Sequence, residues 1–231
     1  EVFFETDFES DAVGSEPSGF DDNSFTPVDG TDIRVIDGAS DPVSPLTGRS
    51  VYILDSTISD NLRLGGDFNG GGNVSAVHVS FDFARGPAQA EGERFAFSMT
   101  HAGLNPTSSS RRPFELRLNE DGSIDMRSGP DAGSLTETND IGTFDPAASN
   151  SIEMLFNSDD SASLDYDVAV GSGTIPANSF HLYINGSLAG EFAMALDPSD
   201  GAVDFATGVS DLGSFSFYQD TNSLGSLIID D

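Results

Sequence analysis

The sequence predicts an all-β protein, folded as a sandwich of two antiparallel sheets. Apolar residues recur at every second position in many short runs, which is typical of strands that bury one face. Gly, Asp, Asn and Ser separate these runs, and no stretch of helix length has a helical period, so helices should be few and short. The length of 231 residues fits one such sandwich, and we expect a single domain over residues 1–231.

Several alternating runs give the clearest strands. In chain order they are residues 33–36, 51–54, 77–83, 95–99, 152–156, 180–184 and 215–218. In each run one set of alternate side chains is apolar, and we expect that set to face the core.

Turn chemistry indicates two hairpins, because Asp-Gly and Asn-Gly readily adopt the positive φ of tight turns. Residues 119–122 should join strands at 114–118 and 124–127, and Asn185-Gly186 should join 180–184 to 188–192. The longest loops are expected at residues 9–32, 102–112 and 127–149. Loops of such length are usually functional or held by a bound group.

The chain is strongly acidic. It carries 39 Asp and Glu residues against nine basic residues, all of them Arg, for a formal net charge of −30. Such a surface repels phosphate backbones and anionic lipid headgroups, so we expect no nucleic-acid partner and no membrane partner. Dispersed carboxylates suit a medium in which salt screens their mutual repulsion, which indicates a marine or halophilic source.

The start of the chain bears on its location. Residues 1–4 read Glu-Val-Phe-Phe, with neither an initiating Met nor a basic segment, as expected after removal of a signal peptide. We therefore expect an exported protein, extracellular or at the cell surface. The absence of Cys gives no information about the compartment.

Three segments resemble parts of carbohydrate-binding jelly rolls. They are residues 5–10 near the start, residues 227–231 at the end, and the hairpin at residues 180–186. This hairpin is similar to the W-x-h-Y-h-N-G hairpin of laminin-G-like and concanavalin-like sandwiches, with Phe180 in the tryptophan place. The resemblance implies a lectin-like jelly roll in which the first and last strands lie side by side.

In such folds an acidic residue near each end often helps to bind a structural calcium ion. The resemblance therefore implies a calcium site at Asp7, Glu9 and Asp230, with carbonyl oxygens from residues 38–48. Calcium takes six to eight oxygen ligands, which carboxylates and carbonyls on irregular chain can supply. The alternative is that these residues belong to the solvated acidic surface.

Arginine is concentrated in the middle of the chain, where six of the nine fall between Arg85 and Arg127. The candidate ligand-binding residues are Arg111, Arg112, Arg117, Arg127 and Tyr183. Alternation puts Glu115 and Arg117 on one strand face, with Arg127 near them across the hairpin. Guanidinium groups can hold uronate or sulfate groups bidentately. The alternative is that they pair with neighbouring carboxylates and stabilise the sheet.

Glu115-Leu116-Arg117 resembles the R-x-E-L-R strand of jelly-roll alginate lyases, although Arg112 stands earlier than that motif places it. The partner motifs Q-[IV]-H and Y-F-K-A-G are missing. A lyase that works by β-elimination needs a base, an acid for the leaving oxygen and a group that neutralises the uronate. The candidates for these catalytic roles are His101, Tyr183 and Arg117.

These observations predict an exported, calcium-stabilised, carbohydrate-binding sandwich that recognises an anionic polysaccharide. The chain has no Trp and only four Tyr, so few aromatic side chains can stack on sugar rings. We therefore expect arginine to make most of the contacts with an anionic sugar. A polysaccharide lyase on the same fold is one alternative. The other is an extracellular structural or adhesive protein that self-associates through strand edges or calcium bridges.

Overall fold

The computed structural model confirms an all-β sandwich. It describes residues 8–18, 20, 31–38, 44–55, 62–67, 72, 74–86, 94–102, 112–129, 131–132, 135–195, 197–198, 212–219 and 225–230. All regular secondary structure in these ranges is β-strand. Within them no helix is long and apolar enough to cross a membrane.

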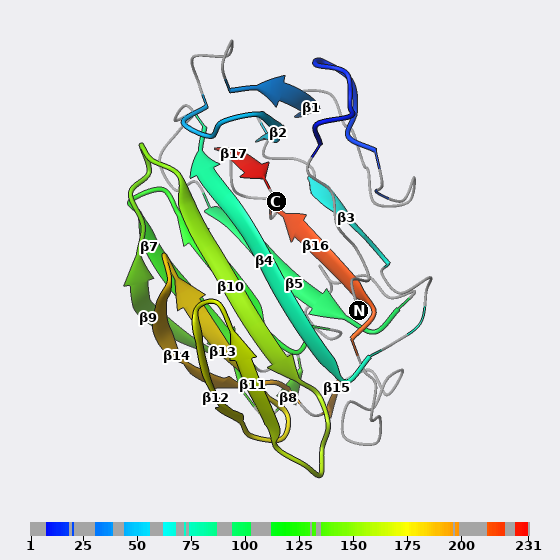
Figure 1. Ribbon diagram of the computed structural model, residues 1–231, viewed down its shortest axis with the longest axis vertical. Helices are drawn as coiled ribbons and strands as arrows, with labels where there is room; N and C mark the ends of the chain where they lie inside the picture. The colour runs from blue at the N-terminus through cyan, green and yellow to red at the C-terminus, as the bar shows by residue number, and fades with distance from the viewer. Residues whose placement is uncertain are drawn as a thin grey trace.

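The larger sheet, called sheet A, has seven strands and faces the viewer in Figure 1. In spatial order they are β1 (Thr31–Asp37), β2 (Arg49–Asp55), β17 (Gly225–Asp230), β4 (Ala76–Arg85), β10 (Asn150–Asn157), β13 (Ser179–Ile184) and β14 (Ser187–Ala193). Each neighbouring pair is antiparallel. The last strand, β17, therefore lies inside the sheet, between β2 and β4.

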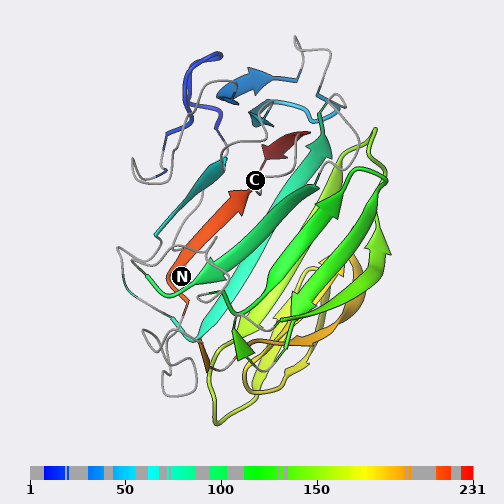
Figure 2. The ribbon, with the colours of Figure 1, turned by 180° about the vertical axis from the view of Figure 1, so that it is seen from behind.

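The second sheet, called sheet B, has six strands and faces the viewer in Figure 2, where β16 is orange. In spatial order they are β3 (Arg63–Asp67), β16 (Ser214–Tyr218), β5 (Arg94–Thr100), β6 (Glu115–Asn119), β7 (Ser123–Ser128) and β9 (Thr136–Thr143). All its pairs are antiparallel. Two small sheets complete the fold. They are the hairpin of β11 (Leu164–Val168) and β12 (Gly171–Ile175), and a short parallel pair of β8 (Asp131–Ala132) and β15 (Asp197–Pro198).

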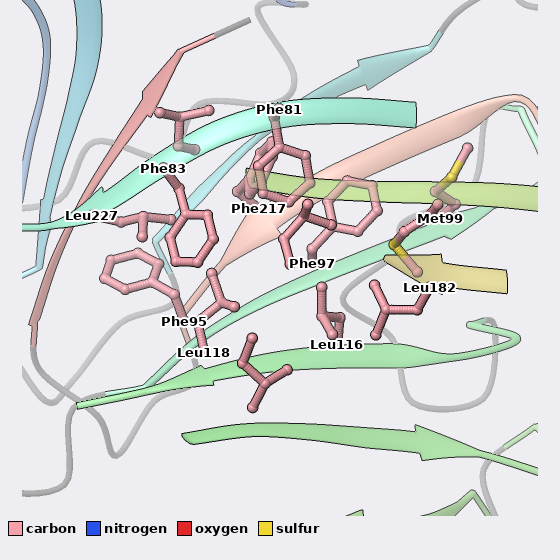
Figure 3. Packing of buried hydrophobic residues seen from close by; sticks show 14 of the residues in the cluster. Phe81, Phe83, Phe95, Phe97, Met99, Leu116, Leu118, Leu182, Phe217 and Leu227 are labelled. Carbon is pink, nitrogen blue, oxygen red and sulfur yellow. The ribbon is translucent and has the colours of Figure 1, made fainter. Parts of the chain in front are cut away.

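One apolar core lies between sheets A and B, and Figure 3 shows part of it. Phe81 of β4 contacts Phe97 and Phe217 of sheet B, with ring centroids 5.5 Å and 4.9 Å apart, and the Phe81–Phe217 pair is edge-to-face. The phenylalanines of the alternating runs thus face the core, as the sequence predicts. Burial of their large aromatic rings contributes much of the free energy that stabilises the core.

The alternating runs and both hairpins are confirmed as strands and turns. Asn185 and Gly186 have φ values of 49° and 73°, as the tight turn requires. The expected loop at residues 127–149 is wrong, because it contains the edge strand β9, whose residues Thr136–Asp140 are all exposed. Of the first strand and turn expected at residues 5–10, residues 5–7 lie outside the described residues, and Phe8, Glu9 and Ser10 are not in a strand.

Candidate functional site

The outer face of sheet B carries a compact group of polar and charged side chains, called the arginine cluster. Its members are Arg112, Glu115, Arg117, Arg127, Glu137 and Tyr218. Leu116 and Leu118 of β6 point into the core, so Glu115 and Arg117, which alternate with them, point outward. Strand pairing then sets Glu115 opposite Arg127 of the neighbouring β7. The hairpin that the sequence predicted therefore brings these three side chains to one side of the sheet.

Strands distant in the sequence complete the cluster. On one side, Tyr218 of β16 pairs with Ala96 of β5, which in turn pairs with Arg117. The small Ala96 side chain between them leaves room for the tyrosine ring and the guanidinium group to lie over the sheet. On the other side, Arg127 pairs with Glu137 of the edge strand β9.

Glu115 is the centre of the cluster. One of its carboxylate oxygens, Oε2, lies 2.5 Å from Nη2 of Arg112 and accepts a hydrogen bond of 3.0 Å from the Tyr218 hydroxyl. Its other oxygen, Oε1, accepts a hydrogen bond from Nε of Arg117. Arg112 also donates from Nη1 to the Tyr218 hydroxyl oxygen at 2.5 Å, and its guanidinium carbon lies 5.7 Å from the tyrosine ring centroid.

The centre of the cluster is buried. Arg112, Glu115, Arg117 and Tyr218 are each less than a tenth exposed. Burial alone would raise the pKa of Glu115, yet the charges of Arg112 and Arg117 and the hydrogen bonds from Arg117 and Tyr218 hold that pKa below its usual value. Burial and the nearby Glu115 charge raise the pKa of Tyr218 well above its usual value, so the phenol keeps its proton at neutral pH.

Two members of the cluster reach solvent. The Arg127 side chain is 26% exposed and the Glu137 side chain is 41% exposed. Glu137 lies 2.5 Å from Nη1 of Arg117 but 3.8 Å from Nε of Arg127, and Glu115 lies 3.7 Å from Nη1 of Arg127. The two distances to Arg127, 3.7 Å and 3.8 Å, are too long for hydrogen bonds. In the described structure, Nε of Arg127 is buried and makes no hydrogen bond.

The outer face of sheet A holds a second set of polar side chains, beneath the β11–β12 hairpin. The Tyr166 hydroxyl of β11 lies 2.8 Å from Nδ1 of His181 and 2.6 Å from the Tyr183 hydroxyl. Nε2 of His181 lies 3.2 Å from Glu191. Burial and the Tyr183 hydroxyl raise the pKa of Tyr166 to about 12, so its hydroxyl stays neutral. These hydrogen bonds, with Leu155 and Ile175, fix the hairpin against β10 and β13.

The residues proposed for a lyase do not come together. Arg117 lies on the outer face of sheet B, whereas Tyr183 alternates with the core residue Leu182 and lies on the outer face of sheet A. His101 follows the end of β5, while Arg117 pairs with Ala96 nearer the start of that strand. Among the candidate ligand-binding residues, Arg112, Arg117 and Arg127 do converge, and Arg111 lies outside the described residues.

The residues expected to bind calcium are placed in part. The Glu9 carboxylate accepts a hydrogen bond of 2.9 Å from the backbone N–H of Arg49, and the Arg49 guanidinium donates to the carbonyl oxygens of Glu9 and Asp11. Asp230 pairs with Asp82 in sheet A, next to Ile229, which pairs with Val51 near the start of β2.

Asp7 lies outside the described residues. Where the structure is described, no three His, Asp or Glu side chains are grouped to hold a metal ion. A calcium site at these residues stays a prediction.

Sequence reasoning missed two members of the cluster, Tyr218 and Glu137. Alternation in the run 215–218 does put Tyr218 on the face opposite Phe217, which is the available signal. No local sequence pattern predicts that β16 lies two strands from β6, because β16 pairs with β5, a strand far from it in the sequence. Glu137 gave no signal, since its strand is exposed and does not alternate.

Comparison with known proteins supports the architecture. No family model and no curated protein sequence matches the chain. An endo-β-1,4-glucuronan lyase from the fungus Trichoderma reesei matches in structure, over 94% of this chain and 91% of its own, with 11% identity and a TM-score of 0.56. The chain has a jelly-roll, lectin-like sandwich fold. A carbohydrate esterase from the Shiga toxin-encoding bacteriophage phi24B also matches, over 87% and 85% of the two chains, with 12% identity and a TM-score of 0.52.

Proposed function

We propose that the protein is an exported carbohydrate-binding sandwich that recognises an acidic polysaccharide through the outer face of sheet B. The observation that carries the proposal is the convergence of Arg112, Arg117 and Arg127 on this face. Three guanidinium groups contact two carboxylates, Glu115 and Glu137, so the cluster itself has a positive surplus in a chain of net charge −30. Asp125 lies on the same face opposite Arg117, but its carboxylate accepts hydrogen bonds from Asn119 and from the backbone N–H of Asp140. A local positive surplus in such a chain favours an anionic group on the ligand.

Arg127 is the group best placed to meet the ligand. Its side chain reaches solvent, and its guanidinium lies too far from both neighbouring carboxylates for hydrogen bonds. A guanidinium offers a planar fork of donors that matches a carboxylate or sulfate group. Arg112 and Arg117 are buried against Glu115 and hold the position of the cluster rather than offering open donors.

The fold is consistent with this proposal. Two of the matching structures are a glucuronan lyase and a carbohydrate esterase, and both names refer to carbohydrate chemistry. The shortage of Tyr and the absence of Trp favour recognition by charge and hydrogen bonds over stacking on sugar rings.

Affinity electrophoresis tests the proposal. Native gels that contain alginate, ulvan or pectin should retard the wild-type protein, whereas a gel with a neutral β-glucan should not. Arg127→Ala should abolish most of the retardation, and Arg127→Lys should restore only part of it, because the charge returns without the fork.

The matched control is Arg34→Ala, which removes the same charge from β1 of sheet A, where Arg34 lies over the Tyr52 ring. Retardation that is equal for wild type and Arg127→Ala, or equal in neutral and acidic gels, would contradict the proposal.

A polysaccharide lyase is a second candidate, and the position of Tyr218 favours it. The Tyr218 hydroxyl lies within the arginine cluster, where it accepts a hydrogen bond from Arg112 and donates one to Glu115. A protonated phenol can act as the acid that donates to a leaving oxygen, while an arginine neutralises the uronate. Growth of ultraviolet absorbance from an unsaturated uronate product, lost in Tyr218→Phe, would establish the lyase. Flat absorbance with retained binding would leave the non-catalytic function.

A further inference from the structure

The two carboxylates of the cluster, Glu115 and Glu137, differ in how firmly they are held. Glu115 is almost completely buried and its carboxylate contacts Arg112, Arg117 and Tyr218. Glu137 lies on the edge strand β9, with 41% of its side chain exposed. Arg117 keeps its ion pair with Glu115 when Glu137 turns away, and the Glu137 carboxylate can be solvated, so Glu137 can leave the cluster at a smaller cost than Glu115.

The pairing of Glu137 with the two arginines is incomplete. A single oxygen, Oε2, serves both Nη1 of Arg117 at 2.5 Å and Nε of Arg127 at 3.8 Å. The β7–β9 pairing fixes the Glu137 backbone opposite Arg127. From there the carboxylate contacts Arg117 but makes no hydrogen bond to the Arg127 guanidinium. A carboxylate that is not tethered to β9 can turn both oxygens toward the guanidinium groups, which is the stronger arrangement.

We propose that Glu137 is a displaceable counter-ion, which occupies the arginines in the free protein and gives way to the carboxylate of a uronate residue on the ligand. The inference rests on the proposed function and names a determinant of its specificity. Because Glu137 carries the same charged group as the ligand, it competes with the ligand and lowers its affinity. Neutral sugars carry no negative charge that could replace it.

The test is titration calorimetry with oligogalacturonate at low salt, comparing wild type with Glu137→Gln. The amide keeps the size of the side chain and removes its charge, so binding should become about 2- to 5-fold tighter, the range expected for a partly exposed ion pair. The gain should shrink as salt is added, because it is electrostatic. In an Arg127→Ala background the same change should have little effect.

The matched control is Glu191→Gln, which removes a partly exposed charge, with 52% of the side chain exposed against 41% for Glu137, from the outer face of sheet A beside His181. It should leave the affinity unchanged. Affinity of Glu137→Gln equal to or weaker than wild type would overturn the inference while the proposed function stands, provided that wild-type binding still depends on Arg127. Equal gains in both variants would also overturn it, since net charge alone would then explain the effect. Absence of binding in every variant would overturn both proposals.

Discussion

Replacement of Glu115 by Gln should destabilise the protein severely, although the two side chains have the same shape. Glu115 is 2% exposed and its carboxylate balances Arg112 and Arg117, which are 7% and 6% exposed. Glutamine removes the negative charge and puts amide N–H donors where an arginine donor needs an acceptor. Loss of one partner of a buried ion pair costs about 3–5 kcal/mol, because the remaining charge stays buried and uncompensated.

Urea unfolding, followed by circular dichroism, measures this cost without the added ionic strength of guanidinium. A loss of about 3–5 kcal/mol would consume a large part of the usual 5–15 kcal/mol stability of a domain. Glu137→Gln is the matched control, since it removes a charge from the same cluster at its exposed edge and should cost less than about 1 kcal/mol. A Glu115→Gln cost no larger than that of Glu137→Gln would refute the reasoning that the buried carboxylate holds the cluster together.

Four further predictions follow from the same structure. Tyr218→Phe should cost about 1–3 kcal/mol in the same urea assay, because Arg112 and Glu115 each lose a buried partner; no change would contradict the hydrogen bonds. The folded-state pKa of Glu115 lies below its usual 4.5, so its contribution is complete above that pH and is lost as the pH falls further, seen as a steeper loss of stability in wild type than in Glu115→Gln. Gly186→Ala should lower the free energy of unfolding by about 1 kcal/mol. The backbone strain of alanine at a φ of 73° is the whole cause, because a new Cβ would meet no atom within 4 Å; an unchanged melting temperature would refute this. If calcium binds near Glu9 and Asp230, EDTA should lower the melting temperature and added calcium should restore it, whereas no response would remove that ion site.

The core of the fold was predictable because its strands bury one face. Runs such as 77–83 and 152–156 alternate large apolar residues with polar ones, and this pattern reports burial directly. Strand β9 gave no such pattern, because it lies at the edge of sheet B with its first five residues exposed. Strand β3 was also missed, since Gly65 and Gly66 interrupt its apolar run. A Cβ on Gly65 would lie 2.1 Å from the Phe215 carbonyl oxygen, so close packing against β16 requires glycine there.

The candidate site was predictable only as far as one hairpin extends. Alternation and the Asp-Gly turn together placed Glu115, Arg117 and Arg127 side by side. Alternation tells which residues share a strand face, but not to which sheet a distant strand belongs. For that reason Tyr183 was grouped with the arginines although it lies on sheet A, and Tyr218, which does lie with them, was not.

The most direct test of the proposed function is the position of a bound ligand. A crystal structure of the protein with an oligogalacturonate should show a uronate carboxylate on the outer face of sheet B, bound by Arg127, with the Glu137 side chain turned away from Arg117. A ligand bound on the outer face of sheet A, beside His181 and the β11–β12 hairpin, would contradict the assignment of the arginine cluster as the binding site.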